Sequence, residues 1–314
     1  MSAISTLPDR APALPVRHRP ALSYELFPAR SDVSFERLRT TIAALEATAP
    51  DHVSVTSKTG QGNLGRVLEV TEHLLVATSL RPLVHLTSIG STRAQLTAIV
   101  ERLLDLGVRG ILALRGDQPE GHDLDQDEVP FARPLVELVR AVEKERSASL
   151  AGGRLSVGVA AYPHCHPESP SAQHDLEVLM AKERAGADFA ITQVFFDPCA
   201  YERLVGRARA AGITIPLVPG FVPATDPRRL ARLAALSGVE APRPLLHAIE
   251  TAADDAERRR IGVAHTVELA ARVLDSGAPG LHLFTFNRHA DALDVLETLD
   301  LDRWSTTTTT GDSR

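Results

Sequence analysis

Short β-rich apolar runs alternate with longer segments of helical period along most of the chain. Eight such runs occur, at residues 21–28, 52–57, 83–88, 110–116, 155–163, 189–196, 215–223 and 280–286. Between them, segments such as 35–47, 93–107 and 172–186 carry apolar residues at intervals of three and four, which is one face of an α-helix. This alternation predicts βα units around a parallel sheet.

The number of runs and their spacing favour a closed barrel. Eight strands with intervening helices in about 280 residues match the size of a (β/α)8 barrel. A doubly wound open sheet is the alternative, but no run is followed by the glycine fingerprint of a dinucleotide-binding fold. We therefore predict an α/β fold, a (β/α)8 TIM barrel over residues 21–300. Extra helices are expected before the last strand, because residues 242–276 exceed one crossover and divide near 253–255.

Composition limits the class of protein and its partners. The 314 residues are 44% hydrophobic with a net charge of -6, which gives no basic footprint for nucleic acid or an anionic membrane. No window approaches the ~18 consecutive apolar residues of a membrane helix. The two cysteines form no Cys-x-x-Cys pair, which favours a reducing cytoplasm. We expect flexible tails at 1–20 and 301–314, and a homo-oligomer is one expectation for a barrel of this kind.

Polar residues collect where the apolar runs end. Buried polar side chains are costly unless they are hydrogen-bonded or serve a ligand, and barrel active sites lie at the carboxyl ends of the strands. These residues therefore predict a polar pocket at one mouth of the barrel. A purely structural pairing of Glu25 with Arg115 across the mouth is the alternative. The residues in question are Glu25, Thr56, His85, Thr87, Arg115, Asp117, Tyr162, His166, Thr192, Gln193, Thr285, Asn287 and Arg288.

A metal site is also conceivable in the segment "HCHPE". Its His164, Cys165 and His166 are all potential ligands. Because alternate residues of an extended chain point to opposite sides, only the two histidines can converge, and no further ligand set is evident. We therefore predict no metal.

Eight segments resemble, in order and spacing, the motifs of the methylenetetrahydrofolate reductases. They are "SYELFP", "HVSVT", "HLTSIGSTRAQL", "GILALRGDQPEG", "VAAYPHCHPES", "AQHDLEVLMAKERAGADFAITQVFFD", "LVPGFVP" and "HLFTFNR". The likeness covers residues 21–299. It implies a barrel that binds FAD and uses NADH or NADPH to reduce methylenetetrahydrofolate to methyltetrahydrofolate, for methionine synthesis. In such ping-pong chemistry the nicotinamide and the reduced folate use one pocket in turn.

The resemblance also implies roles for the polar residues at the run ends. Glu25 matches the general acid, which must stay protonated near neutral pH, and its neighbours Tyr24, Leu26 and Phe27 suggest an apolar wall that raises its pKa. Asp117 matches a carboxylate beside the flavin and the pterin and is predicted to be catalytic and cofactor-binding.

Further positions match residues that surround FAD or the folate. Arg115 and Gly116 match flavin contacts, since a cation suits a pyrophosphate and a glycine allows close approach. Asp175 and Lys182 lie seven apart on one predicted helix face, where they can grip different parts of the dinucleotide, although a plain surface pair is the alternative. The remaining matches are Thr56, His85, Tyr162 and His166 for FAD, and Gln193 and Arg288 for the folate.

The chain departs from the family pattern in two loops. Residues 57–65 read "SKTGQGNLG" where relatives carry an aromatic residue, and Pro227 stands where relatives place another. Nicotinamide preference and flavin retention are the properties these changes affect. A folate-binding barrel with weak, lost or flavin-independent redox activity is therefore the alternative function. A lyase or aldolase is a third, but no strand end carries an obvious Schiff-base lysine.

Overall fold

The computed structural model describes residues 16–57, 63–117, 127–147, 150 and 153–308. Its main sheet is parallel, in the order β8-β7-β6-β5-β4-β3-β2-β10-β9. The strands are β2 (Ala21–Leu26), β3 (His52–Val55), β4 (Pro82–Thr87), β5 (Gly110–Leu114), β6 (Ser156–Ala161), β7 (Phe189–Thr192), β8 (Leu217–Val218), β9 (Gly220–Phe221) and β10 (Gly280–Phe284).

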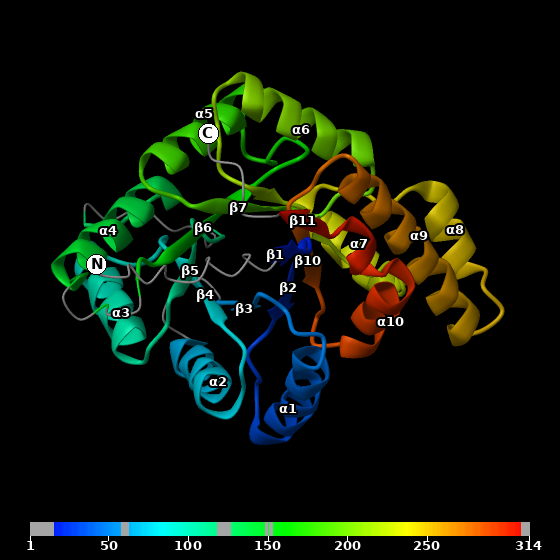
Figure 1. Ribbon diagram of the computed structural model, residues 1–314, viewed down its shortest axis with the longest axis horizontal. Coiled ribbons are helices and arrows are strands. Elements are labelled where there is room, and N and C mark those ends of the chain that lie inside the picture. The colour runs from blue at the N-terminus through cyan, green and yellow to red at the C-terminus, as the bar shows by residue number, and fades with distance from the viewer. Residues whose placement is uncertain (1–15, 58–62, 118–126, 148–149, 151–152, 309–314) are drawn as a thin grey trace, which may run out of the picture.

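The two ends of this sheet belong to one predicted strand. β8 and β9 are separated only by Pro219, and β8 pairs with β7 whereas β9 pairs with β10. The run 215–223 therefore closes the sheet, which surrounds a central axis in Figure 1. The split has a physical reason, because proline has no N–H to donate to a ladder. The carbonyl of Pro219 instead accepts from the His282 N–H at 2.9 Å. The predicted (β/α)8 barrel is confirmed.

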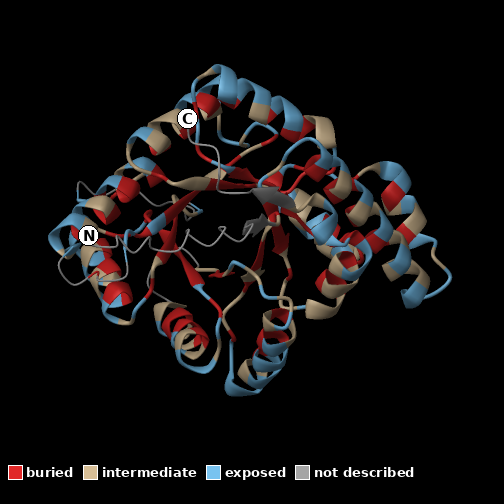
Figure 2. Cartoon of the chain, viewed as in Figure 1, coloured by how far each residue is buried: buried red, intermediate tan, exposed pale blue. Residues whose placement is uncertain are grey.

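Helices surround the barrel, with buried residues on their inner faces and exposed residues outside (Figure 2). They are α1 (Asp32–Glu46), α2 (Leu64–Ala77), α3 (Arg93–Asp105), α4 (Ala132–Glu145), α5 (Ala172–Arg184), α6 (Pro198–Ala210), α7 (Pro227–Ser237), α8 (Arg243–Glu250), α9 (Asp255–Asp275) and α10 (His289–Leu299). The two helices predicted before the last strand are α8 and α9. None of the helices in the described part of the chain is long and apolar enough to cross a membrane.

Parts of the two predicted tails pair with each other. β1 (Val16–His18) and β11 (Thr306–Thr308) form an antiparallel two-stranded ribbon, with Arg17 opposite Thr307. Residues 1–15 and 309–314 lie outside the described residues, so the flexibility predicted for them stays a prediction.

The sheet is packed differently on its two faces. Tyr24 and Leu26 of β2 point outward into the large apolar core beneath the helices. On the inner face, the His52 ring of β3 lies 5.9 Å from the Phe189 ring of β7. These strands are not neighbours in the sheet, so both rings lie inside the barrel. Glu25 has the inward phase of β2, because side chains alternate along a strand.

Candidate active site at the carboxyl end of the barrel

Glu25 and His85 meet inside the mouth of the barrel. They come from β2 and β4, the two strands that flank β3. Oε2 of Glu25 lies 3.6 Å from Nε2 of His85, and the two side chains are only 12% and 5% exposed. This distance is longer than a hydrogen bond, but it shows that the carboxyl group and the imidazole ring are adjacent.

Burial favours the neutral form of both groups. It raises the pKa of Glu25 to about 7, against the hydrogen-bonding effect of the Thr56 hydroxyl, which lowers it. Burial also lowers the pKa of His85 to about 3. A protonated imidazole would stabilise the carboxylate, so a neutral His85 leaves the Glu25 proton in place. Burial therefore gives Glu25 a pKa close to neutral pH, as the proposed acid requires, while its role as an acid stays a prediction.

The predicted cause of this pKa shift is wrong in part. Tyr24 and Leu26 do not wall in the Glu25 carboxyl group, because they point to the other face of the sheet. The Tyr24 hydroxyl is bonded to Thr48, at 2.7 Å, on the helix side. Residues beside Glu25 in the chain therefore contribute less to its burial than residues from other strands.

Arg115 does not pair with Glu25. Its Nη1 bonds Oε2 of Glu168 at 2.5 Å, and this bond raises the pKa of Arg115. The structural alternative, in which Glu25 and Arg115 pair across the mouth, is therefore wrong. Glu168 is not among the residues predicted for the site, since it lies 53 residues from Arg115 and outside any apolar run. Its signal in the sequence is its place in the "HPE" segment after β6.

Gly116 and Asp117 follow Arg115 in the loop after β5, at the mouth of the barrel. Gly116 has a φ of 85°, a left-handed conformation that favours glycine. Asp117 is exposed, and its charge adds a minor contribution to the raised pKa values of Arg115 and Tyr162, whose main causes are the bond to Glu168 and burial, respectively. Arg115, Asp117 and Tyr162 therefore share one electrostatic environment.

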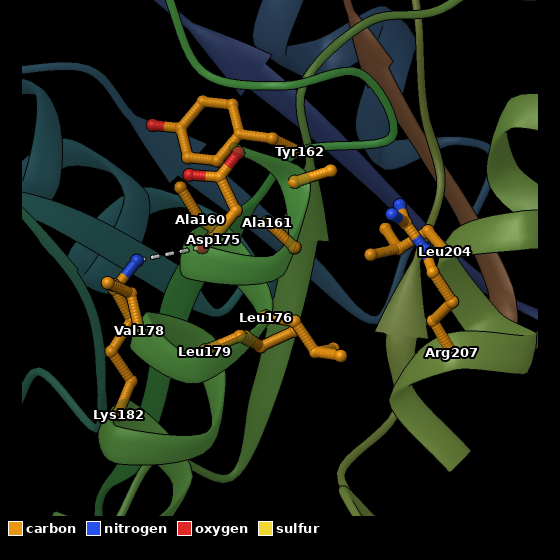
Figure 3. Close-up of a pocket in the computed structure, with 11 residues that line it drawn as sticks. Ala160, Ala161, Tyr162, Asp175, Leu176, Val178, Leu179, Lys182, Leu204 and Arg207 are labelled. Atoms are coloured by element: carbon orange, nitrogen blue, oxygen red, sulfur yellow. Dashed lines mark hydrogen bonds between the residues drawn. The ribbon is translucent and has the colours of Figure 1, made fainter. Parts of the chain in front are cut away.

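Tyr162, His166 and Asp175 form a second contact group at the end of β6. The Tyr162 and His166 rings meet edge to face, with centroids 4.7 Å apart. The His166 backbone N–H donates to Oδ2 of Asp175 at 2.9 Å. In Figure 3 the Asp175 carboxyl group points toward the Tyr162 ring. Burial is the main cause that raises the pKa of Tyr162, to about 12.

Tyr162, Asp175 and Lys182 line one pocket between β6 and α5, with Asp175 and Lys182 on one face of α5 (Figure 3). Lys182 is 8% exposed, and its Nζ donates to the Ala160 carbonyl at 3.0 Å. Burial lowers its pKa to about 8, while the Asp175 charge acts in the opposite direction. The prediction that Asp175 and Lys182 share a helix face is confirmed, and the alternative of a plain surface pair is wrong for a lysine this buried.

The two predicted folate residues lie at separate strand ends. Gln193 follows β7, and its backbone N–H donates to the Ala161 carbonyl at 2.8 Å, which holds it next to the β6 group. Arg288 follows β10 and is 55% exposed, with its Nε 3.2 Å from the carboxylate of buried Asp291. Asp291 also lies within 3.8 Å of Arg229, so it anchors cations at this side of the mouth.

The two departures from the family pattern differ in how far the structure describes them. Pro227 is the first residue of α7, where Asp226 caps the helix by accepting from the Arg228 and Arg229 N–H groups. Its fixed φ suits a first helical position. Of the loop 57–65, residues 58–62 lie outside the described residues. Across the described parts of residues 16–308, no group of three or more His, Cys, Asp or Glu is placed to hold a metal ion.

Comparison with known proteins identifies the family. A family model for methylenetetrahydrofolate reductase matches residues 12–300. The chain belongs to the methylenetetrahydrofolate reductase family. A 5,10-methylenetetrahydrofolate reductase of Pectobacterium carotovorum is 34% identical over 280 residues, which cover 88% of this chain and 89% of that protein.

Two further proteins are similar to this chain, one over part of its own length and the other at the level of the fold. A Caenorhabditis elegans protein named "Probable methylenetetrahydrofolate reductase (NADPH)" is 36% identical over 221 residues, and the chain covers 32% of its length. An uncharacterized protein from Clostridium thermocellum, which binds two copies of 5-methyl-5,6,7,8-tetrahydrofolic acid, shares the fold with a TM-score of 0.61 at 12% identity. The match covers 91% of this chain and 96% of that one.

Proposed function

We propose that this chain reduces methylenetetrahydrofolate to methyltetrahydrofolate, with FAD as its redox cofactor and NADH or NADPH as the hydride donor. The observation that carries the proposal is Glu25, a carboxyl group 12% exposed at the barrel mouth whose pKa is raised to about 7 by burial. Family membership supports the oxidoreductase class. A group of this pKa can donate a proton at neutral pH and recover it afterwards.

The donor set at the mouth fits a flavin dinucleotide. Arg115, which is ion-paired with Glu168, would supply a cation for a diphosphate, and Gly116 offers backbone without a side chain. Lys182 is buried and bonded to the Ala160 carbonyl, so it would add positive charge behind the site. Tyr162 and His166 add ring surface beside them. These residues would hold the dinucleotide together with Thr56, His85, Asp117 and Asp175. When bound, FAD supplies hydride transfer between nicotinamide and folate.

Glu25 performs the proton transfer of the folate half-reaction. It holds a proton on its carboxyl group and donates it to the bridging-ring nitrogen of the folate, which opens that ring and leaves an iminium carbon ready to accept hydride. His85 stays neutral beside it, since burial lowers its pKa to about 3. Gln193 orients the pterin with its amide, Asp117 lies at the same mouth, and Arg288 receives the glutamate carboxylate of the folate.

An absorption spectrum tests the proposal in two half-reactions. The purified protein, or the protein reconstituted with FAD, should be yellow and should bleach when NADH or NADPH is added without oxygen. Methylenetetrahydrofolate added next should restore the colour. Protein that takes up no FAD contradicts the proposal. Protein that binds the folate but never bleaches supports the alternative, a folate-binding barrel without this redox activity.

Substitution of the proposed acid separates the half-reactions. Glu25→Gln should bleach with nicotinamide as the unchanged protein does, because no proton from Glu25 is needed there. Its reoxidation by the folate should slow by about 100- to 10,000-fold, the usual contribution of a general acid. Glu36→Gln, on exposed α1, is the control and should change neither rate. Equal losses in both half-reactions would contradict the role of Glu25.

A further inference from the structure

The backbone ladder between β2 and β10 stops at the residue that carries the proposed chemistry. Its last pair is Glu25 with Phe284. Beyond that pair, side-chain hydrogen bonds join the two segments that follow β2 and β10. The Thr285 Oγ1 donates to the Glu25 carbonyl at 2.6 Å. The position of Glu25 therefore depends on the segment directly after β10, about 260 residues away in the chain.

Asn287 continues the ladder with its side chain. Its Nδ2 donates to the Phe27 carbonyl at 2.9 Å, and its Oδ1 accepts from the Phe27 N–H at 2.8 Å. The amide thus binds both polar groups of one residue, as a paired strand does. Together, Thr285 and Asn287 hold β2 at Glu25 and again two residues later.

The turn that presents Asn287 is held in an unfavourable conformation. Phe286 and Asn287 have φ values of 49° and 60°. Asparagine tolerates this left-handed region, whereas a bulky aromatic residue rarely adopts it. Such strain persists where surrounding contacts fix it and is concentrated at functional sites. Here Phe286 stacks on Phe27 with centroids 5.6 Å apart, and the Arg288 N–H closes the turn on the Thr285 carbonyl at 2.9 Å.

This turn also joins two residues of the proposed folate site. Arg288 is the last residue of the turn. Thr285, its first residue, donates a hydrogen bond to the Glu25 carbonyl. A change in the turn would therefore move the proton donor relative to the folate, while the group at the end of β6 stays in place.

We propose that Asn287 is a positioning residue, whose side-chain amide fixes the end of β2 and thereby sets where the Glu25 carboxyl group stands against the folate. This inference rests on the proposed function. Asn287 acts through the backbone of Phe27, so its effect is expected in the folate half-reaction and not in flavin reduction by nicotinamide.

Asn287→Gly is the test variant, because glycine keeps the left-handed backbone and removes only the amide clamp. Flavin reduction by nicotinamide should stay within about twofold, and reoxidation by methylenetetrahydrofolate should slow by about tenfold or more, as displacement of an aligned group does. The pH profile of reoxidation should also move to lower pH. A loosened β2 end admits water, which weakens the effect of burial on Glu25.

The effect of Asn287 on Glu25 can also be measured without cofactor and without an activity assay. Infrared difference spectra between the protein and its Glu25→Gln variant isolate the protonated carboxyl band of Glu25. Its titration midpoint should lie near pH 7 in the unchanged protein, since burial raises the pKa of Glu25 to about 7. In the Asn287→Gly background the midpoint should fall by about one unit. An unchanged midpoint together with an unchanged folate rate overturns the inference.

Ala49→Gly is the matched control. Ala49 is another left-handed non-glycine residue, with a φ of 48°, and it lies between α1 and β3 at the opposite end of the barrel. This variant should alter neither half-reaction nor the midpoint. A purely structural role for Asn287 would instead lower the melting temperature and slow both half-reactions together, which also overturns the inference.

A second pair of variants keeps the test open if Asn287→Gly does not fold. Thr285→Val removes the hydroxyl that bonds the Glu25 carbonyl and should slow only the folate half-reaction, whereas Thr285→Ser keeps the bond and most of the rate. Equal folate rates in Thr285→Val and Thr285→Ser would contradict a positioning role for these hydrogen bonds. If the unchanged protein fails in both half-reactions, the proposed function fails; if it succeeds and these variants match it, only the positioning role fails.

Discussion

Strands β10, β2, β3 and β4 line much of their side of the barrel interior with polar side chains, whereas β5, β7 and β8 line the other side with apolar ones. The polar half contains Ser23, Glu25, His52, Ser54, His85 and His282. The apolar half is built from Leu112, Ile191 and Val218 with Leu114 and Phe189, joined by Leu83 from β4. The two halves meet where His52 contacts Phe189.

The apolar half gains rigidity from close packing. Gly158 of β6 illustrates how tight it is, since a Cβ there would lie 2.7 Å from the Phe189 ring and 2.8 Å from Leu112. Such contacts leave no room for even one more methyl group. This half is therefore closely packed where β5, β6 and β7 meet.

The polar half is buried, and its three histidines are uncharged near pH 7. Burial lowers the pKa of His52 to about 4 and that of His85 to about 3, and it lowers the pKa of His282 well below its usual value. The His282 ring is bonded to the Ser23 hydroxyl at 2.9 Å. Neutral imidazoles provide polar surroundings for Glu25 without a positive charge that would ionise it. The pKa of Glu25 is therefore raised by exclusion of water and not by a neighbouring anion.

The largest expected difference between the halves is in stability. Ile191→Ala removes a side chain that is 5% exposed in the apolar half and should lower the free energy of unfolding by about 3 kcal/mol. Leu236→Ala removes a leucine that is 72% exposed on α7, and it should change stability by less than about 0.5 kcal/mol. Urea unfolding of the two variants measures both values. A small loss for Ile191→Ala would mean that the apolar half is loosely packed.

A slightly smaller effect is expected from acid in the polar half. His52 binds a proton with a pKa of about 4 when folded, against 6.5 as its ordinary value. Below pH 6.5 the unfolded chain therefore binds a proton that the folded chain excludes. The free energy of unfolding consequently decreases as the pH is lowered. Between pH 7 and 4.5 this one group accounts for about 2 kcal/mol of the loss.

His52→Phe should remove that contribution. Phenylalanine has a similar shape, keeps ring contact with Phe189 and binds no proton. Urea unfolding at pH 7 and at pH 4.5 should show that the variant loses about 2 kcal/mol less stability than the unchanged protein over this interval. Equal losses in the two proteins would show that His52 is charged or exposed in the folded state, and the view of a neutral polar half would then be wrong.

The barrel itself could be predicted from the sequence because its signal is local. Each run carries its own apolar pattern, and turns and caps follow within a few residues. The division of the seventh strand into β8 and β9 depends on Pro219, whose missing N–H is visible in the sequence but whose partner strands are not. The pairing of β1 with β11 joins residues 16 and 308, so no local pattern could indicate it.

The sequence predicts candidate positions at the strand ends, but it does not predict the contacts between them. The alternation along β2 is enough to separate Glu25 from Tyr24, yet adjacency in the sequence wrongly indicates Tyr24 as part of its wall. Contacts such as Arg115 with Glu168, or Asn287 with Phe27, join residues 53 and 260 apart. The closure of the barrel decides which charged residues pair with each other. No single segment of the sequence contains that information.

The smallest expected effect concerns a hydroxyl in the polar half. Within the part of the chain that the structure describes, Ser54 is fully buried and its Oγ has no hydrogen-bond partner. Ser54→Ala should therefore change the free energy of unfolding by less than about 0.5 kcal/mol, because no bond is lost and a buried polar atom is removed. Ser31→Ala is the matched control: the Ser31 hydroxyl caps α1 by accepting from the Ser34 N–H, and its loss should cost about 1 kcal/mol. If urea unfolding shows that Ser54→Ala costs as much as Ser31→Ala, the Ser54 hydroxyl makes a bond of comparable strength. The polar half would then be a hydrogen-bonded network and not a set of separately buried polar groups.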